Sequence, residues 1–400
     1  MNSFKEKYLI SFWDNTRVFI LLGILSAVYF GIFGNVWAVT GEFTRLGGEF
    51  LEFLGLNLDG YSYYQKQNLE GNILTRTDGV MILGMFIGCF IAALLSNKIK
   101  IRFPASKIRV FQAIIGGILS GYGARLAFGC NLANFFTGLP YFSLHTWVFT
   151  FFMILGIYIG VKICNISFFK PKARLIRVDK EDKVLKNNTL LAKFYFLLGI
   201  ILFIIFLFLI IYLFFINGDI SLQNRKSLLT LALIFGFIFG FLVAKGQICF
   251  TSCFRDLFLF KRDNAIKAAL IAMMLANIIA FAFILQGHTS KIIEISPALM
   301  LGAFLFGFGI VFAGGCECGW TYRAFEGQIH FVIVGIANIA GTMILALSYD
   351  LLPHYFIKGV KINLLNTFGN LEGLIISLVL FLSLFIWTIT YKQYFFNKDN

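Results

Sequence analysis

Residues Leu301 to Gly327, LGAFLFGFGIVFAGGCECGWTYRAFEG, contain the pattern that decides the fold, because Gly117 to Gly138, GILSGYGARLAFGCNLANFFTG, repeats it much earlier. In each copy a G-x-G pair is followed, after the same interval, by Gly-Cys, namely Gly129-Cys130 and Gly315-Cys316. Glycines allow helices to pack closely in apolar surroundings, and each copy leads from such glycines to a thiol. This duplication indicates a paired site built by two halves of a membrane protein.

The composition places the chain in a membrane. Of its 400 residues, 59% are hydrophobic and only 14% are charged. Soluble domains have about 25% charged residues, so a water-soluble fold is excluded. Ten apolar runs are long enough to cross a bilayer. They lie near residues 18–33, 80–95, 110–128, 147–161, 194–216, 228–244, 265–285, 298–313, 331–347 and 374–389.

The charged residues orient these spans. Basic residues are concentrated between the second and third spans, at 98–109, and between the fourth and fifth spans, at 170–186. Because such loops stay on the cytoplasmic side, we predict that both are cytoplasmic, and ten spans then leave both termini there. This topology also explains the formal net charge of +14, so we expect a lipid bilayer and no nucleic acid as partner.

A polar stretch between the first two spans is too short to cross the bilayer but has helical periodicity. It runs from Val36 to Gly55, VWAVTGEFTRLGGEFLEFLG, with Thr40 as a plausible N-cap. Such a segment either enters the membrane as a re-entrant half-helix or lies flat at the interface, and periodicity does not decide between the two. After the sixth span comes Ala244 to Phe258, AKGQICFTSCFRDLF, whose Thr251 can be aligned with Thr40.

The aligned segments define two repeats of four spans each. We expect the first repeat in residues 1–164 and the second in residues 227–349, joined by a cytoplasmic loop and one further span in residues 165–226. Residues 350–400 add an outer loop, a final span and a cytoplasmic tail. Because the fifth span intervenes, the second repeat is inverted. The predicted fold is therefore an all-α integral membrane protein of about ten transmembrane helices with four re-entrant half-helices, which is typical of transporters.

Several cysteines lie where a transporter of this fold would have its substrate path. Cys130 and Cys316 each follow a glycine and begin a short helix, where backbone N–H groups attract anions and favour the thiolate. Cys249 and Cys253 share one helical face, and Cys318 forms a C-x-C pair with Cys316. A structural role for these thiols stays open, as does zinc or iron–sulfur binding. Their spacing matches no standard metal motif, so we expect no metal and no cofactor.

Polar and charged side chains beside these segments complete the set of candidates. Ionisable groups at membrane depth normally face an interior pathway and pair with one another, whereas snorkelling from helix ends is the alternative. We place Asn131 and Glu317, each directly after a cysteine, on the path with the thiols. Glu42 and Glu317 are expected to pair with the nearby arginines. The accessory candidates are Thr40, Glu42, Arg125, Thr251, Cys253, Arg255, Cys318 and Arg323.

These stretches resemble a known family. GGILSGYGARLAFGCNLANFFTG, GQICFTSCFRD and FGFGIVFAGGCECGWTYRAFEG are similar to the YeeE/YedE sulfur-transport family. WAVTGEFTRLGGEFLEFLG, LEGNILTRTDGVMILGMFIGC and KINLLNTFG resemble its YedE, or FdhT, branch, which is associated with selenium metabolism. The resemblance covers nearly the whole chain.

The resemblance implies an importer in the bacterial inner membrane for a small sulfur-containing anion, which is thiosulfate in the YeeE relatives. In the YedE branch the implied cargo is a selenium or sulfur compound, often beside a cytoplasmic TusA-like sulfur-carrier protein. The family cysteines correspond to Cys130, Cys249 and Cys316, whereas Ala38 stands at the fourth symmetric position. A relay of four equivalent thiols is therefore not expected.

Three functions remain open at this point. The leading one is transport, without enzymatic activity, of a thiosulfate-like or selenium-containing oxyanion through weak thiol sites in series. In the second, Cys249 or Cys316 carries a persulfide or selenide for sulfur or selenium transfer. The third is an accessory role in formate dehydrogenase maturation.

Overall fold

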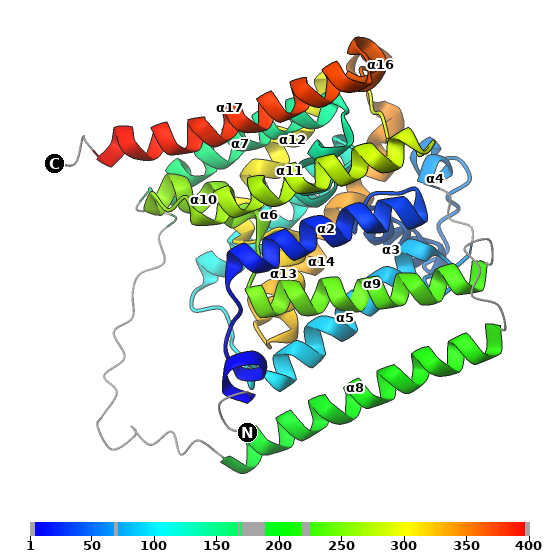
Figure 1. Ribbon diagram of the computed structural model, residues 1–400, viewed down its shortest axis with the longest axis vertical. Helices are drawn as coiled ribbons and strands as arrows, with labels where there is room; N and C mark the ends of the chain where they lie inside the picture. The colour runs from blue at the N-terminus through cyan, green and yellow to red at the C-terminus, as the bar shows by residue number, and fades with distance from the viewer. Residues whose placement is uncertain (1–4, 68–70, 167–168, 170–188, 218–224, 397–400) are drawn as a thin grey trace.

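A computed structural model of the protein describes residues 5–67, 71–166, 169, 189–217 and 225–396. The long helices lie side by side in one bundle (Figure 1), and the described residues contain no β-strand, which confirms the all-α prediction. The long helices are α2 (Asn15–Phe33), α5 (Thr77–Leu95), α6 (Lys107–Leu126), α7 (Leu144–Cys164), α8 (Thr189–Asn217), α9 (Arg225–Gly246), α11 (Asn264–Leu285), α12 (Pro297–Ala313), α14 (Ile329–Ser348) and α17 (Asn370–Phe396).

Shorter helices lie between them. Six of them are η1 (Lys5–Ile10), α4 (Ser62–Gln67), η3 (Leu139–Tyr141), η5 (Tyr349–Leu351), α15 (His354–Ile357) and α16 (Leu364–Phe368). Four others coincide with the predicted half-helices, and they are α3 (Thr40–Phe53), η2 (Asn131–Phe136), α10 (Phe250–Phe260) and α13 (Glu317–Phe325). Their existence as short helices agrees with the sequence, while their re-entrant position in a bilayer stays a prediction.

Nine segments of the described chain are long and apolar enough to cross a membrane, against about ten expected. The difference is α6, which is less apolar because it includes Lys107, Arg109, Gln112 and Arg125. In Figure 1, α2 begins and α17 ends at the same end of the bundle, which fits an even number of crossings and counts α6 as the tenth. The side of the membrane stays a prediction, and the basic stretch 170–186 lies outside the described residues.

The helix pairs with the most extensive contacts follow the same pattern in the two predicted repeats. When α2, α5, α6 and α7 are matched in order with α9, α11, α12 and α14, the pair α5–α9 corresponds to α2–α11. The pair α6–α14 corresponds in the same way to α7–α12, and α6–α12 is its own counterpart. This is the packing that two related four-helix units would produce. Outside this arrangement, α8 packs against α5 and α9 at the edge of the bundle (Figure 1).

Glycines hold the central pair α6 and α12 at backbone contact. A Cβ atom at Gly116 or Gly123 would overlap the backbone of α12, and one at Gly302 or Gly309 would overlap the backbone of α6. Burial of apolar area cannot drive association in lipid, so close packing of small residues stabilises such a pair. The crossing therefore fixes the ends of α6 and α12, which lead directly into the two Gly-Cys motifs.

Candidate functional site

Cys130, Cys249 and Cys316 share one local position, because each is the N-cap residue of a short helix. They precede η2, α10 and α13, respectively. The first N–H groups of a helix have no intrahelical partner, so they are available to the cap side chain. The amides of Leu132 and Ala133 interact with the Cys130 sulfur, and the amide of Cys316 interacts with the Cys249 sulfur. We call these three cysteines the thiol centre.

The same backbone turn precedes each thiol. Phe128, Gln247 and Gly314 have φ angles of 52°, 50° and 80°, two residues before Cys130, Cys249 and Cys316, respectively. This left-handed conformation ends a long helix abruptly and lets the next one begin. Glycine adopts it freely, whereas for a residue such as Phe128 it is strained, and such strain is concentrated at functional sites.

Two of the thiols are in contact. The sulfur atoms of Cys249 and Cys316 lie 3.8 Å apart, and both side chains are buried. Gly319, on the first turns of α13, makes this approach feasible, because a Cβ atom there would lie 2.5 Å from the Cys249 sulfur. A 3.8 Å separation fits a weak S–H···S hydrogen bond between two free thiols.

Glu317 connects the third thiol to this pair. The buried Cys130 side chain interacts with the Thr40 side chain and with the Glu317 carboxyl. The Glu317 carboxyl also interacts electrostatically with Cys249. The structure thus brings together Thr40, Glu317 and all three cysteines of the thiol centre.

Unpartnered polar atoms are found within two positions after each of these cysteines in the described chain. Both side-chain amide atoms of Asn131, the Thr251 hydroxyl and Oε2 of Glu317 are buried without a hydrogen-bond partner in the described part of the chain. An unsatisfied buried polar group costs about 1–3 kcal/mol, and native proteins contain few of them. Three such groups beside three thiols indicate a site that binds a polar ligand.

A pocket of about 240 Å³ lies on one side of the thiol centre. Arg45, Arg125, Lys291 and Asp78 line it together with Gly129, the residue before Cys130. We call it the Arg125 pocket. Nε of Arg125 donates a 2.9 Å hydrogen bond to the Tyr63 hydroxyl, but no carboxylate pairs with its guanidinium in the described residues.

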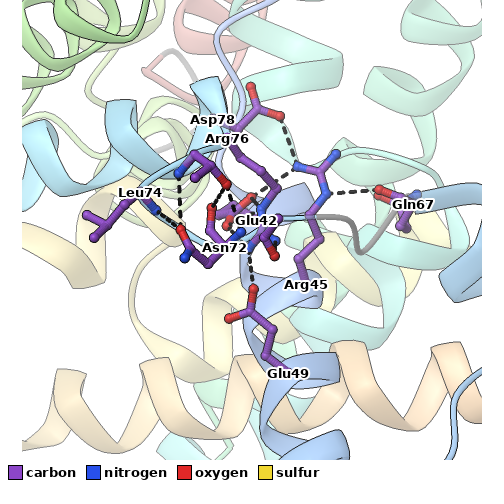
Figure 2. A network of polar contacts seen from close by, with 10 residues as sticks. Glu42, Arg45, Glu49, Gln67, Asn72, Leu74, Arg76 and Asp78 are labelled. Carbon is purple, nitrogen blue, oxygen red and sulfur yellow. Dashed lines mark hydrogen bonds and ion pairs between the residues drawn. The ribbon is translucent and has the colours of Figure 1, made fainter. Parts of the chain in front are cut away.

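Arg45, in contrast, is held in a network of ion pairs, which Figure 2 shows. Its Nη1 atom lies 3.0 Å from Glu42 and 3.2 Å from Asp78. Arg76 lies 2.6 Å from both Glu42 and Glu49, so it ties α3 to the start of α5 (Figure 2). The positive charge of the Arg125 pocket is therefore contributed by Arg125 and Lys291, neither of which forms a close ion pair among the described residues, although Asp78 in the same pocket interacts electrostatically with Lys291.

This network corrects one prediction. Glu42 pairs with Arg45 and Arg76, and not with any of the arginines that the sequence suggested, namely Arg125, Arg255 and Arg323. The prediction was wrong because Arg45 lies one helical turn after Glu42, and the chain folds back to bring Arg76 beside it. Glu317 likewise has no arginine partner among the described residues, and its Oε1 accepts a 3.3 Å hydrogen bond from Asn338.

A second basic pocket, of about 330 Å³, lies on the other side of the thiol centre. Arg102, Arg109, Arg255 and His330 line it together with Gly314. We call it the Arg109 pocket. Because Arg109 and Arg125 belong to the same helix, α6, the two pockets are separated by about 24 Å at ~1.5 Å per residue.

Two arginines near the Arg109 pocket, Arg255 and Arg323, bind other groups of the protein. Arg255 binds Asp256 at 2.9 Å and donates to the Gly314 carbonyl at 3.2 Å. Arg323 donates to the same carbonyl at 3.0 Å. Both guanidinium groups therefore stabilise the C-terminal end of α12, where the helix dipole is negative, and their charge lies close to Cys316.

The remaining cysteines lie outside the thiol centre. Cys253 and Cys318 are buried on α10 and α13, without a sulfur–sulfur contact to another cysteine in the described chain. The Cys89 thiol donates a 3.3 Å hydrogen bond to the Gly240 carbonyl between α5 and α9, which is a packing role.

Three residues near the site, Asn338, Gly319 and Lys291, were not among the candidates predicted from the sequence. Asn338 could have been noticed, because it is an amide within the apolar run of α14. Gly319 and Lys291 carry no local signal, since only the packing of distant segments places them beside Cys249 and Arg125.

Comparisons with known proteins agree with this site. Residues 2–159 and 245–398 match the family described as Sulphur transport. Two proteins described as probable transporter YedE, from Salmonella typhimurium and Escherichia coli, are each 43% identical over 396 residues, which is 99% of this chain and 96% of theirs. The thiosulfate transporter TsuA of Escherichia coli is 38% identical over 105 residues, which is 26% of this chain and 30% of that protein. The chain is a multi-pass membrane protein that belongs to the Sulphur transport family, as its resemblance to YeeE/YedE proteins implied.

Proposed function

We propose that this protein transports a small sulfur- or selenium-containing oxyanion across the bacterial inner membrane, from the Arg125 pocket to the Arg109 pocket. One observation carries the proposal. Two positively charged pockets lie at opposite ends of α6, and between them are buried thiols beside unpartnered polar atoms. A relative named thiosulfate transporter supports an anion of this kind as cargo.

The path begins in the Arg125 pocket. The charges of Arg125 and Lys291 attract the anion and offset part of its desolvation. The anion then reaches Cys130, where the thiol and the free Asn131 amide offer hydrogen-bond donors. Beyond Glu317 it meets Cys249 and Cys316. Thiols are weak donors, so each site holds the anion loosely, as sequential release requires.

The release side is the Arg109 pocket, near Arg255 and Arg323. Phe103 lines it with 77% of its surface accessible, and Ile101, which precedes the lining residue Arg102, has 68% of its surface accessible. Apolar side chains beside a basic pocket are suited to a protein that receives the cargo. We assign this place to a cytoplasmic carrier of the TusA type, which would draw transport forward by removing the anion.

We further propose that the chain consists of two inverted repeats, in residues 1–164 and 227–349, with α3, η2, α10 and α13 as re-entrant half-helices. The exchangeable helix pairings support this relation. The basic loop at 98–109 then places the Arg109 pocket and both termini in the cytoplasm. Labelling with a membrane-impermeant maleimide tests the orientation, because a cysteine introduced at Glu294 should react from outside and one at Ala105 only from inside.

A second function is favoured by the contact between Cys249 and Cys316. With sulfur atoms 3.8 Å apart, a thiolate on one can attack a persulfide on the other, which passes one sulfur atom and leaves a thiolate behind. A selenium atom could move in the same way towards formate dehydrogenase maturation. Cargo found covalently bound to either cysteine after turnover would favour this function over transport.

The deciding experiment compares uptake of radiolabelled thiosulfate and selenite by cells that lack other uptake routes, with and without this protein. We expect at least one anion to accumulate only with the protein. Uptake of thiosulfate alone would exclude a selenium-specific cargo, and uptake of selenite would support the branch assignment. If neither anion enters, the transport proposal fails and sulfur transfer takes its place.

A further inference from the structure

The carboxyl group of Glu317 differs from the other deeply buried carboxylates of the described chain. Glu42 lies within 3.0 Å of two arginines, and Asp263 within 2.7 Å of two lysines, Lys267 and Lys392. Glu317 is equally buried, with 1% of its surface accessible, yet no cationic side chain pairs with it in the described residues. The neutral Asn338 amide donates a hydrogen bond to Oε1 at 3.3 Å, the Cys130 thiol also interacts with the carboxyl group, and Oε2 has no hydrogen-bond partner among the described residues.

The surroundings of Glu317 disfavour a negative charge. An ionised carboxylate without a cation is costly to bury, and the neutral acid avoids this cost. The titratable groups that face it are thiols, namely Cys130 from η2, Cys249 from α10, and Cys316 and Cys318 beside it. Ionisation of any of them would add negative charge. The groups that α14, α6 and α3 place nearby are Asn338, Ser120 and Thr40, which are neutral.

The position of Glu317 matters because the group interacts with both Cys130 and Cys249. An anion that passes between these thiols must come close to the carboxyl group. An ionised Glu317 would repel it strongly in a medium of low dielectric constant. A neutral acid has the opposite effect, because a proton on the unpartnered Oε2 is an O–H donor directed at the path.

We propose that Glu317 is a proton-bearing ligand, so that the centre of the path binds the anion only while this carboxylic acid is protonated. The inference rests on the proposed transport function and adds to it that the anion and one proton occupy the centre together. No bond to the anion forms, since the proton stays on Oε2 and is shared through a hydrogen bond. Thermodynamic linkage then requires binding at the centre to weaken as Glu317 ionises.

Infrared difference spectroscopy on the full-length protein in lipid nanodiscs tests the protonation state without reference to transport. We expect a protonated-carboxyl C=O band at neutral pH that disappears in Glu317→Gln. Addition of thiosulfate or selenite should shift this band. Absence of a Glu317-dependent band would overturn the proposal, and so would a band that the transported anion leaves unchanged.

Uptake into proteoliposomes at saturating anion gives the second test. Above the pH at which Glu317 ionises, the wild-type rate should fall about tenfold per pH unit, because one required proton is lost. Glu317→Gln keeps a neutral donor and should remove this pH dependence, whatever rate it retains. An unchanged pH dependence in this variant would contradict the proposal.

Glu326→Gln provides the matched control, because Glu326 follows the same helix and both of its carboxyl oxygens accept hydrogen bonds, from Gln247 and Gln328. Its pH dependence should equal that of the wild type. Failure of the wild type to take up any anion would refute the transport function, while the infrared band still decides the state of Glu317.

Discussion

The residue after the cysteine is Asn131 at one helix break and Glu317 at the other, and both side chains keep buried polar atoms that have no hydrogen-bond partner in the part of the chain that the structure describes. We call these places the Cys130 break and the Cys316 break. Each follows the end of a central helix, α6 or α12, and each begins with a left-handed residue two positions before the thiol. The backbone conformation is the same at both breaks, but the side chain after the cysteine is an amide at the Cys130 break and a carboxylic acid at the Cys316 break.

The surroundings of the two breaks differ further. At the Cys130 break the thiol makes no sulfur–sulfur contact in the described residues, and the break opens towards Arg125 and Lys291, neither of which forms a close ion pair there. At the Cys316 break a second thiol, Cys249, lies 3.8 Å away, and the arginines are bound to the Gly314 carbonyl. Free cations attract an anion strongly, whereas paired thiols hold it weakly. The comparison therefore suggests capture at the first break and release at the second.

Removing either thiol should have the largest effect. Cys130→Ala and Cys316→Ala should each abolish anion uptake while the protein is still produced and inserted, because a methyl group cannot donate a hydrogen bond to the cargo. Cys89→Ala is the control, since this buried thiol packs between α5 and α9. It should retain nearly full uptake. Full activity in one of the two test variants would remove that break from the path.

Forcing the two thiols of the Cys316 break apart should reduce uptake at least tenfold. In Gly319→Ala the new Cβ atom would lie 2.5 Å from the Cys249 sulfur, so either this thiol must turn away from Cys316 or α10 and α13 must separate. Oxidative cross-linking of Cys249 to Cys316 should slow in parallel. Gly60→Ala is the control, because a Cβ atom there meets nothing within 4 Å. Rapid cross-linking in Gly319→Ala would show that the contact does not depend on this glycine.

Neutralising the free arginine of the Cys130 break should weaken capture. Arg125→Gln is expected to raise the half-saturating anion concentration about tenfold, the equivalent of ~1.4 kcal/mol, with a smaller effect on the maximal rate. Concentration-dependent uptake measures both quantities. Arg17→Gln, at the exposed start of α2, serves as a control for the loss of one positive charge. A fall in maximal rate alone would place Arg125 in a later step.

The pH dependence of capture should be the smallest effect. Desolvation in the Arg125 pocket, reinforced by the charge of Arg125, lowers the pKa of Lys291 to about 8. Lysine is charged below its pKa, so the pocket loses one positive charge as the pH rises from about 7 to 9, and the half-saturating concentration should rise a few-fold. Lys291→Gln should behave at all pH values like the wild type at pH 9. A half-saturating concentration in the wild type that does not change with pH would exclude this role.

Much of the fold followed from local patterns. Apolar runs gave the long helices because a bilayer requires about twenty apolar residues per span, and only α6 fell below the expected composition. The positions of the four short helices also followed, since polar segments with helical periodicity interrupt those runs. Cys130 and Cys316 could be selected from the sequence because each follows a glycine and begins such a segment, whereas Cys249 was selected through the resemblance to the family.

The contacts of these residues could not be predicted in the same way. Cys249 and Cys316 are separated by 67 positions in the sequence. No local sequence pattern indicates that their sulfur atoms are in contact or that Gly319 makes room for them. The pairing of Glu42 with Arg76 was missed for the same reason, because the partner arrives through a turn of the chain between α3 and α5.

By itself, the sequence determined that this chain lies in a membrane, where its long helices lie to within several residues, and that Cys130 and Cys316 begin short helices. Those properties depend on neighbours along the chain, through hydrophobic length, glycine spacing and helix capping. The tertiary structure alone decided which charges are neutralised, which polar atoms stay free, and that two basic pockets lie on either side of the thiol centre. Such properties depend on distances between segments remote in sequence, and those distances are set by the close packing of α6 against α12 and α14.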